Sequence, residues 1–275
     1  MSEESDDQEF LGKLVRLAQR QSERHRALEA RPQASDVQPG SPLAGDEAKS
    51  HPYQVGHGAW HALTVAQDHL LCLHSSLHGE PGRVLIHTHA QFTLIRAGLE
   101  NAARAVWLLH SKDRATRVTR RLAMQRNEIR ASYKMRELVG DPGRRTKQQA
   151  LEELNTLLAA VLGVTDAEAE QVLKHTPVSY KDMVRDAAPV AGVPADAAEL
   201  IWSAGSAIAH GDTHGTLSVL DKEVSAGRSA KGHGVAMARV TGSVSGLYWS
   251  MLVATLLLDT GYDLYTQRAR SPFGR

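Results

Sequence analysis

Helical spacing of apolar residues is the feature that most constrains the fold of this chain. From about residue 53 onward, apolar residues recur at steps of three and four, and segments rich in Gly and Pro interrupt them. Such steps place apolar side chains on one face of a helix, whereas Gly and Pro end helices. We expect helices at about 55–78, 84–110, 113–138, 147–162, 166–174, 180–186, 195–210 and 242–267. The pattern therefore predicts a mainly α protein, an antiparallel helical bundle.

Composition agrees with closely packed helices and narrows the class of protein. Aromatic residues make up only 5% of the 275 residues, so the interior must be filled mainly by Leu, Val and Ala. The formal net charge is +1, and any nucleic-acid or membrane binding must therefore rest on local patches. Cys72 is the only cysteine, which favours a reducing, cytoplasmic location. The longest apolar stretch, Leu247 to Leu258, is shorter than the roughly 20 residues that span a bilayer, so we expect no membrane partner.

The first 52 residues differ from the rest of the chain. Residues 10–31 have the pattern of a polar helix with a thin apolar seam. Residues 32–52 contain four prolines and no periodicity, which predicts a flexible linker. We therefore expect an N-terminal polar helix and flexible linker over residues 1–52, followed by a helical-bundle domain over residues 53–275.

One segment departs from helical spacing. Residues 216–225 and 234–241 alternate apolar and polar side chains, with a glycine-rich stretch between them. This alternation predicts a small β-hairpin insertion near residues 216–241. Arg228 and Lys231 lie in its loop, which lacks the P-loop arrangement of glycines, Lys and Ser or Thr.

The second helix of the expected bundle carries a charged stripe. Arg96, Glu100 and Arg104 are four residues apart and share one face, and Trp107 falls within the same arc. One interpretation is a ladder of ion pairs facing solvent. In the other, Trp107 marks the face as covered, and the arginines bind a phosphate or carboxylate in a pocket. Asn101, beside Glu100, joins the candidate ligand-binding residues.

A second stripe of hydroxyl and imidazole groups lies on the helix expected at 195–210. Glu199, Ser203, Ser206 and His210 share one face among small residues that let another helix approach. His210 stands at the helix C-terminus, where it either caps the helix or holds and protonates an anion. We predict that the two stripes face each other across an anion site.

The ligand-binding residues of this site would then include Ser203, Ser206 and Asp212. A serine hydrolase is disfavoured, because the sequence has no G-x-S-x-G turn.

The stripes also carry a resemblance. Residues 95–103, 107–109 and 206–211 resemble a group of uncharacterised bacterial helical proteins, which in turn resemble the HEPN superfamily of helical-bundle nucleotide- and RNA-binding proteins. The likeness covers about residues 60–265. It implies an RNA or nucleotide partner and a homodimer.

Active HEPN ribonucleases carry a nearby Arg and His at a dimer interface. Arg104 and His110 have such a spacing, as do Arg20 and His25, whereas the helix before His210 has no arginine at that spacing.

The segment between residues 112 and 147 is strongly basic, with twelve Lys or Arg against four acids. The basic residues are Lys112, Arg114, Arg117, Arg120, Arg121, Arg126, Arg130, Lys134, Arg136, Arg144, Arg145 and Lys147, and the acids are Asp113, Glu128, Glu137 and Asp141. Such a surface binds an RNA backbone, is simply a solvated face, or is a docking site for the acidic N-terminal segment.

His57, His61 and Asp68 share a helix face at a spacing that suits a metal ion. The chain is rich in histidine throughout, however, so we assign no metal ligands and no cofactor.

These patterns favour a HEPN-like helical protein that binds a nucleotide or RNA phosphate in a polar interhelical pocket. One alternative is a metal-independent endoribonuclease of the toxin or defence type, with His210, Arg104 and His110 as catalytic residues. Another is an oligomeric interaction protein without catalysis.

Overall fold

The computed structural model describes residues 3–31, 33–79, 83–141, 143, 145–225 and 237–272. Within them it contains eleven α-helices, one 3-10 helix and a two-stranded hairpin. The mainly α bundle with a small β-hairpin is therefore confirmed.

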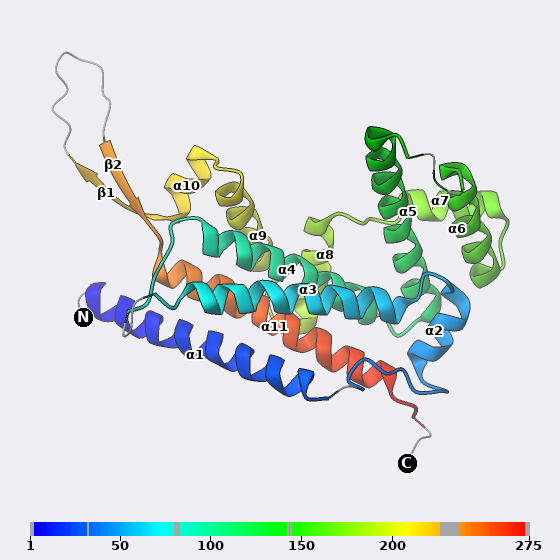
Figure 1. Cartoon of the computed structure of the whole chain (residues 1–275), viewed down its shortest axis with the longest axis horizontal. Helices are drawn as coiled ribbons and strands as arrows, with labels where there is room; N and C mark the ends of the chain where they lie inside the picture. The colour runs from blue at the N-terminus through cyan, green and yellow to red at the C-terminus, as the bar shows by residue number, and fades with distance from the viewer. Residues whose placement is uncertain are drawn as a thin grey trace.

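Four long helices form the body of the bundle. They are α1 (Glu3–Glu29), α3 (Val55–Ser76), α4 (Ala90–Leu109) and α11 (Val244–Ala269). They lie along the long axis of the molecule, with α3 running opposite to the other three (Figure 1). Small residues let them approach closely: a Cβ added at Gly98 of α4 would lie 3.2 Å from Leu70, and one at Gly261 of α11 would lie 2.7 Å from Leu63.

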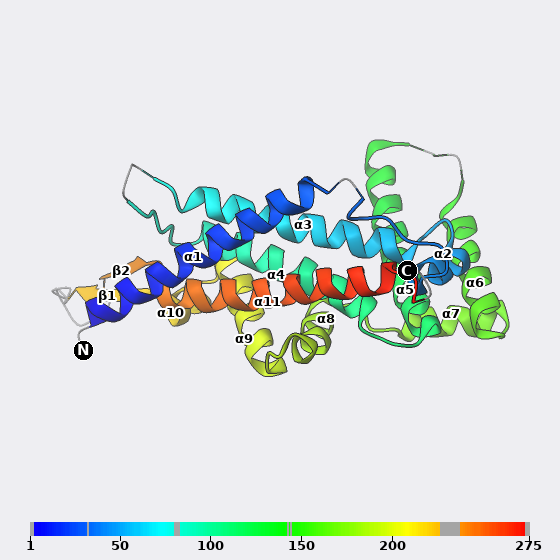
Figure 2. The same cartoon turned by 90° about the horizontal axis from the view of Figure 1, so that it is seen from below.

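The remaining helices cover one side and one end of this body. They are α2 (Pro42–Ser50), α5 (Arg114–Val139), α6 (Lys147–Leu162), α7 (Asp166–His175), α8 (Tyr180–Ala187), η1 (Ala188–Ala191), α9 (Ala195–Ala209) and α10 (Thr213–Val219). Helices α5, α6 and α7 project together at the end away from the N-terminus, whereas α8 and α9 pack on α4 (Figures 1 and 2). Helices α5 and α6 end at Gly140 and Gly163. The φ angles of these residues, 69° and 70°, lie in the left-handed region, which glycine adopts most readily.

The expectation of a flexible linker over residues 32–52 is wrong for residues 42–50, which form α2. Ser41 caps this helix by accepting a hydrogen bond from the backbone N–H of Ala44. Leu43 and Asp46 are fully buried. Helix α1 also packs on α3 and α11, where it buries Leu14.

The hairpin is shorter than expected. Strand β1 (Asp221–Ser225) pairs antiparallel with β2 (Met237–Thr241). Residues 213–219 form α10 instead of a strand, because Asp212 caps a helix there. The glycine-rich loop with Arg228 and Lys231 lies outside the described residues.

Helix α11 is long and apolar enough to cross a membrane, judged by length and composition alone. Half of its most apolar window is buried inside the protein, mainly against α4 and α1. This length, composition and burial are also typical of the core helix of a helical bundle, so they are weak evidence for a membrane span.

Candidate functional site

The charged stripe of α4 is covered, and its first half joins α4 to α9. Arg96 pairs with Glu100 at 2.8 Å, and the indole N–H of Trp202 donates to the same carboxylate at 2.6 Å. The Arg96 guanidinium lies 5.8 Å from the centre of the Trp202 ring. Glu100 is only 8% exposed, so this contact is an internal network and not a ladder facing solvent.

Replacing Glu100 with alanine is expected to lower the free energy of unfolding by about 2–3 kcal/mol. The change leaves the Trp202 N–H and the Arg96 guanidinium without their acceptor in a covered contact. Urea denaturation measures the loss, and Glu137→Ala on the exposed face of α5 is the matched control. Equal effects of the two changes would contradict the account.

The second stripe faces outward. Ser203 and His210 are exposed, and Glu199 pairs with Lys181 at 2.9 Å and with Arg185 of α8. The structure therefore does not form the predicted anion chamber between the two stripes. The reason is local: α9 turns Gly205 and Trp202 toward α4, which leaves its hydroxyl and imidazole groups on the other side.

Two further candidates lie on this part of the chain. Ser206 is half-buried, and Asp212 accepts the backbone N–H of Gly215 at 2.7 Å as the cap of α10. On α4, the Asn101 amide donates to the Ala97 carbonyl at 3.0 Å.

Arg104 and His110, which have the HEPN-like spacing, contact different helices. Arg104 contacts Glu128 of α5 at 2.5 Å, and its Nε is buried without a hydrogen-bond partner. His110 lies 3.2 Å from Asp186 of α8 and 2.6 Å from a guanidinium nitrogen of Arg120. The structure thus does not bring Arg104 and His110 to one shared site.

The environment of His110 predicts a pH dependence of stability. Burial lowers the pKa of His110 below its usual 6.5, and the charge of Arg120 lowers it further against the opposing effect of Asp186. Because the unfolded chain then binds more protons below about pH 6.5, the free energy of unfolding should fall as the pH falls through that region. Chemical denaturation at about pH 7.5 and 5.5 should show a smaller loss in His110→Gln than in the wild type. If His110→Gln lost as much unfolding free energy between these pH values as the exposed-site control His89→Gln, the prediction would be contradicted.

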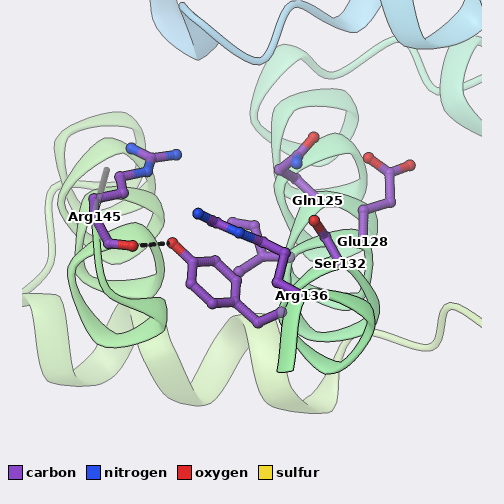
Figure 3. Close-up of a pocket in the computed structure, with 7 residues that line it drawn as sticks. Gln125, Glu128, Ser132, Arg136 and Arg145 are labelled. Atoms are coloured by element: carbon purple, nitrogen blue, oxygen red, sulfur yellow. Dashed lines mark hydrogen bonds between the residues drawn. The ribbon is translucent and has the colours of Figure 1, made fainter. Parts of the chain in front are cut away.

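The other end of the α4 stripe leads to a cleft between α5 and α6. A cavity of about 620 Å³ opens there, lined by Gln125, Glu128, Ile129, Ser132, Tyr133, Arg136 and Arg145 (Figure 3). Arg136 comes from α5 and Arg145 from the segment that leads into α6. The Tyr133 hydroxyl spans the cleft and donates to the Arg145 carbonyl at 2.6 Å.

Both arginines are held in place by neighbouring groups. Arg145 donates to the Tyr53 hydroxyl at 2.7 Å and to Glu153 at 2.6 Å, and these hydrogen bonds raise its pKa, so it stays charged. Arg136 lies 3.1 Å from Asp141, with its guanidinium 4.9 Å from the centre of the Tyr133 ring.

The carboxylate in the cleft is neutralised by two arginines, one on α4 and one on α5 itself. Glu128 pairs with Arg104 at 2.5 Å and with Arg121 at 3.5 Å. The Arg104 end of the predicted stripe therefore supports the cleft from behind, although it is not one of its lining residues.

The two helices of the cleft carry more exposed positive charge. Arg130 and Lys134, four residues apart, are exposed on the side of α5 turned away from the cavity-lining residues, and Lys147 is exposed at the start of α6. Across the part of the chain that the structure describes, none of the three forms an ion pair. Arg114 and Arg117, by contrast, both bind the buried Asp46. The basic segment therefore divides into internal arginines and an exposed set on α5 and at the start of α6.

The metal interpretation of the histidine stripe gains no support. The described ranges contain no group of three His, Cys, Asp or Glu side chains that could hold a metal ion.

Comparison of the chain with family models, with curated proteins and with solved structures gave no match. The resemblance to HEPN proteins accordingly stays a prediction.

Proposed function

We propose that this protein binds RNA through its phosphate backbone at the cleft between α5 and α6. The observation that carries the proposal is that Arg136 and Arg145 both line one cavity. Planar guanidinium groups suit phosphate because they donate paired hydrogen bonds. Arg130 and Lys134 on the other side of α5, and Lys147 at the start of α6, add exposed positive charge for a strand that runs around α5, which suits a chain of phosphates better than a single one.

The cleft also offers surfaces for bases. Tyr133 and Ile129 line it, and the Arg136 guanidinium lies over the Tyr133 ring. Single-stranded RNA places unstacked bases against aromatic rings and guanidinium planes, whereas duplex RNA presents mainly its backbone. We therefore expect preference for single-stranded over double-stranded RNA of the same length.

Fluorescence anisotropy with a labelled single-stranded RNA tests the proposal. Arg136→Gln should weaken binding about fivefold, because a charge-assisted contact of about 1 kcal/mol is lost. Arg20→Gln, an exposed change of the same charge on α1, should leave affinity unchanged. Absence of saturable binding, or equal weakening by both variants, would contradict the proposal.

The endoribonuclease alternative, with His210, Arg104 and His110 as catalytic residues, remains a hypothesis without a shared site among these side chains. A homodimer, a cytoplasmic location and the role of an oligomeric interaction protein likewise stay predictions. RNA cleavage by the purified protein that is lost in His210→Ala would favour the endoribonuclease.

A further inference from the structure

Two adjoining cavities lie on the opposite side of the bundle from α8 and α9, where the segment between α1 and α2 meets α3 and α11. Their volumes are about 590 and 580 Å³, and they share Ser35, Trp60 and Thr64 as lining residues. Neither contributes to the RNA cleft, because no residue lines both sites.

An aromatic cluster lies between these cavities. The half-buried Trp60 ring is 5.9 Å from the ring of Tyr262 and 5.0 Å from that of Tyr265. The Arg24 guanidinium lies 5.0 Å from the centre of the Tyr262 ring and pairs with Asp259. The Tyr262 ring therefore already makes a cation–π contact within the protein. Trp60, which lines both cavities, has no such partner among the described residues.

Negative charge surrounds the cluster. Asp36 and Glu47 line the first cavity, and Glu29 and Asp68 line the second. Among the described lining residues, Arg31 is the permanent cation that opposes these four carboxylates.

One of these carboxylates has a neighbour that offsets it, and the pKa of Tyr265 reflects two of the others. Glu29 lies 3.1 Å from His25, so part of its charge has a local partner. Burial raises the pKa of Tyr265 to about 12, and the nearby charges of Glu47 and Asp36 act in the same direction.

A buried acceptor without a donor points to a ligand. Gln67 is 2% exposed and lines the second cavity beside Asp68. Its amide nitrogen donates to the Gln21 carbonyl at 3.4 Å, but its Oε1 has no hydrogen-bond partner. Buried acceptors are normally paired, so this one needs an N–H or O–H group from something that enters the cavity.

We propose that the two cavities together bind an aliphatic polyamine. One ammonium group would lie between Asp68 and the Gln67 carbonyl, and its alkyl chain would cross the face of Trp60. A second ammonium group would lie between Asp36 and Glu47. An ammonium group supplies the N–H donor that the Gln67 carbonyl lacks. Its positive charge is attracted by the four carboxylates. The methylene chain between the two ammonium groups suits the aromatic surface of Trp60.

Isothermal titration calorimetry with spermidine on RNA-free protein tests this site. We expect saturable binding at physiological salt. Asp68→Asn and Glu47→Gln should each weaken it about tenfold, because each removes a charged acceptor. The surface control Glu223→Gln should not change it.

A second variant separates a specific site from diffuse attraction. Gln67→Met removes the unpartnered acceptor, so it should weaken spermidine binding about tenfold without lowering the melting temperature. No saturable heat, or equal weakening in Glu223→Gln, would overturn the proposal. So would full affinity in both Gln67→Met and Asp68→Asn. Because RNA is absent from the titration, failure here leaves the RNA cleft untouched.

Discussion

Replacing Asp46 with alanine is expected to lower the free energy of unfolding by about 3–5 kcal/mol, the range for breaking a buried ion pair from one side. Asp46 is fully buried on α2, and Arg117 of α5 is 2% exposed. Its carboxylate accepts two hydrogen bonds from Arg117, at 2.6 and 2.7 Å, and one from Arg114 at 3.2 Å. Alanine leaves the Arg117 charge buried without its counter-ion.

Urea denaturation of the wild type and three variants tests this prediction. Asp263→Ala is the control, because this carboxylate is 84% exposed and lies 3.9 Å from Arg24. It should change stability by less than about 0.5 kcal/mol. The double variant Asp46→Leu/Arg117→Met should recover much of the loss, because neither charge then remains buried. Equal stability of Asp46→Ala and the wild type would show that α2 does not hold α5.

The triple variant Arg130→Gln/Lys134→Gln/Arg136→Gln is expected to weaken binding of single-stranded RNA about 100-fold. An exposed charge-assisted contact contributes about 1 kcal/mol, or about fivefold, and three such contacts are lost together. Arg130 and Lys134 form no internal ion pair in the described part of α5, so the change should leave the fold intact. Fluorescence anisotropy measures the affinity, and circular dichroism checks the helices.

The matched control removes the same charge elsewhere. Arg16, Arg20 and Arg26 are exposed on α1, away from the projecting α5 and α6 (Figure 1). Changing all three to glutamine should weaken RNA binding less than about threefold, the effect of net charge alone. If both triple variants lose affinity equally, RNA is attracted by overall charge, and the cleft has no special role.

Most of the helices could be predicted from the sequence because their apolar spacing and their breakers agree. The helix expected at 147–162 has the same bounds in the structure, with a threonine cap at one end and Gly163 at the other. Helix α4 begins at Ala90, later than expected, because residues 83–89 are taken up by a loop that pairs Val84 with His78.

Helix α2 could not be predicted from local sequence. It has nine residues, and its proline-rich surroundings have the composition of a linker. Its stabilising partner, Arg117, lies 71 residues further along the chain. A contact of that range leaves no periodic signal, so the one available hint was the Ser-Pro start of a capped helix.

The candidate site was only partly accessible to sequence reasoning. The covered α4 stripe was one of two interpretations of the sequence, indicated because Trp107 shares its arc, and Trp107 is indeed buried under Arg120. The outward turn of Ser203 and His210 was missed because side-chain class alone does not say which face of α9 meets α4. The basic segment was recognised as a whole, but separating Arg136 and Arg145 from internal arginines such as Arg117 required coordinates.

The salt dependence of RNA binding tests the central claim most directly. Each phosphate contact that is lost lowers the slope of log affinity against log salt by about 0.7 for a single strand. The slope should therefore fall by about 2 from wild type to the α5 triple variant and stay unchanged in the α1 triple variant. An unchanged slope in the α5 variant would show that these cations do not contact phosphates, and it would contradict the assignment of RNA binding to the cleft.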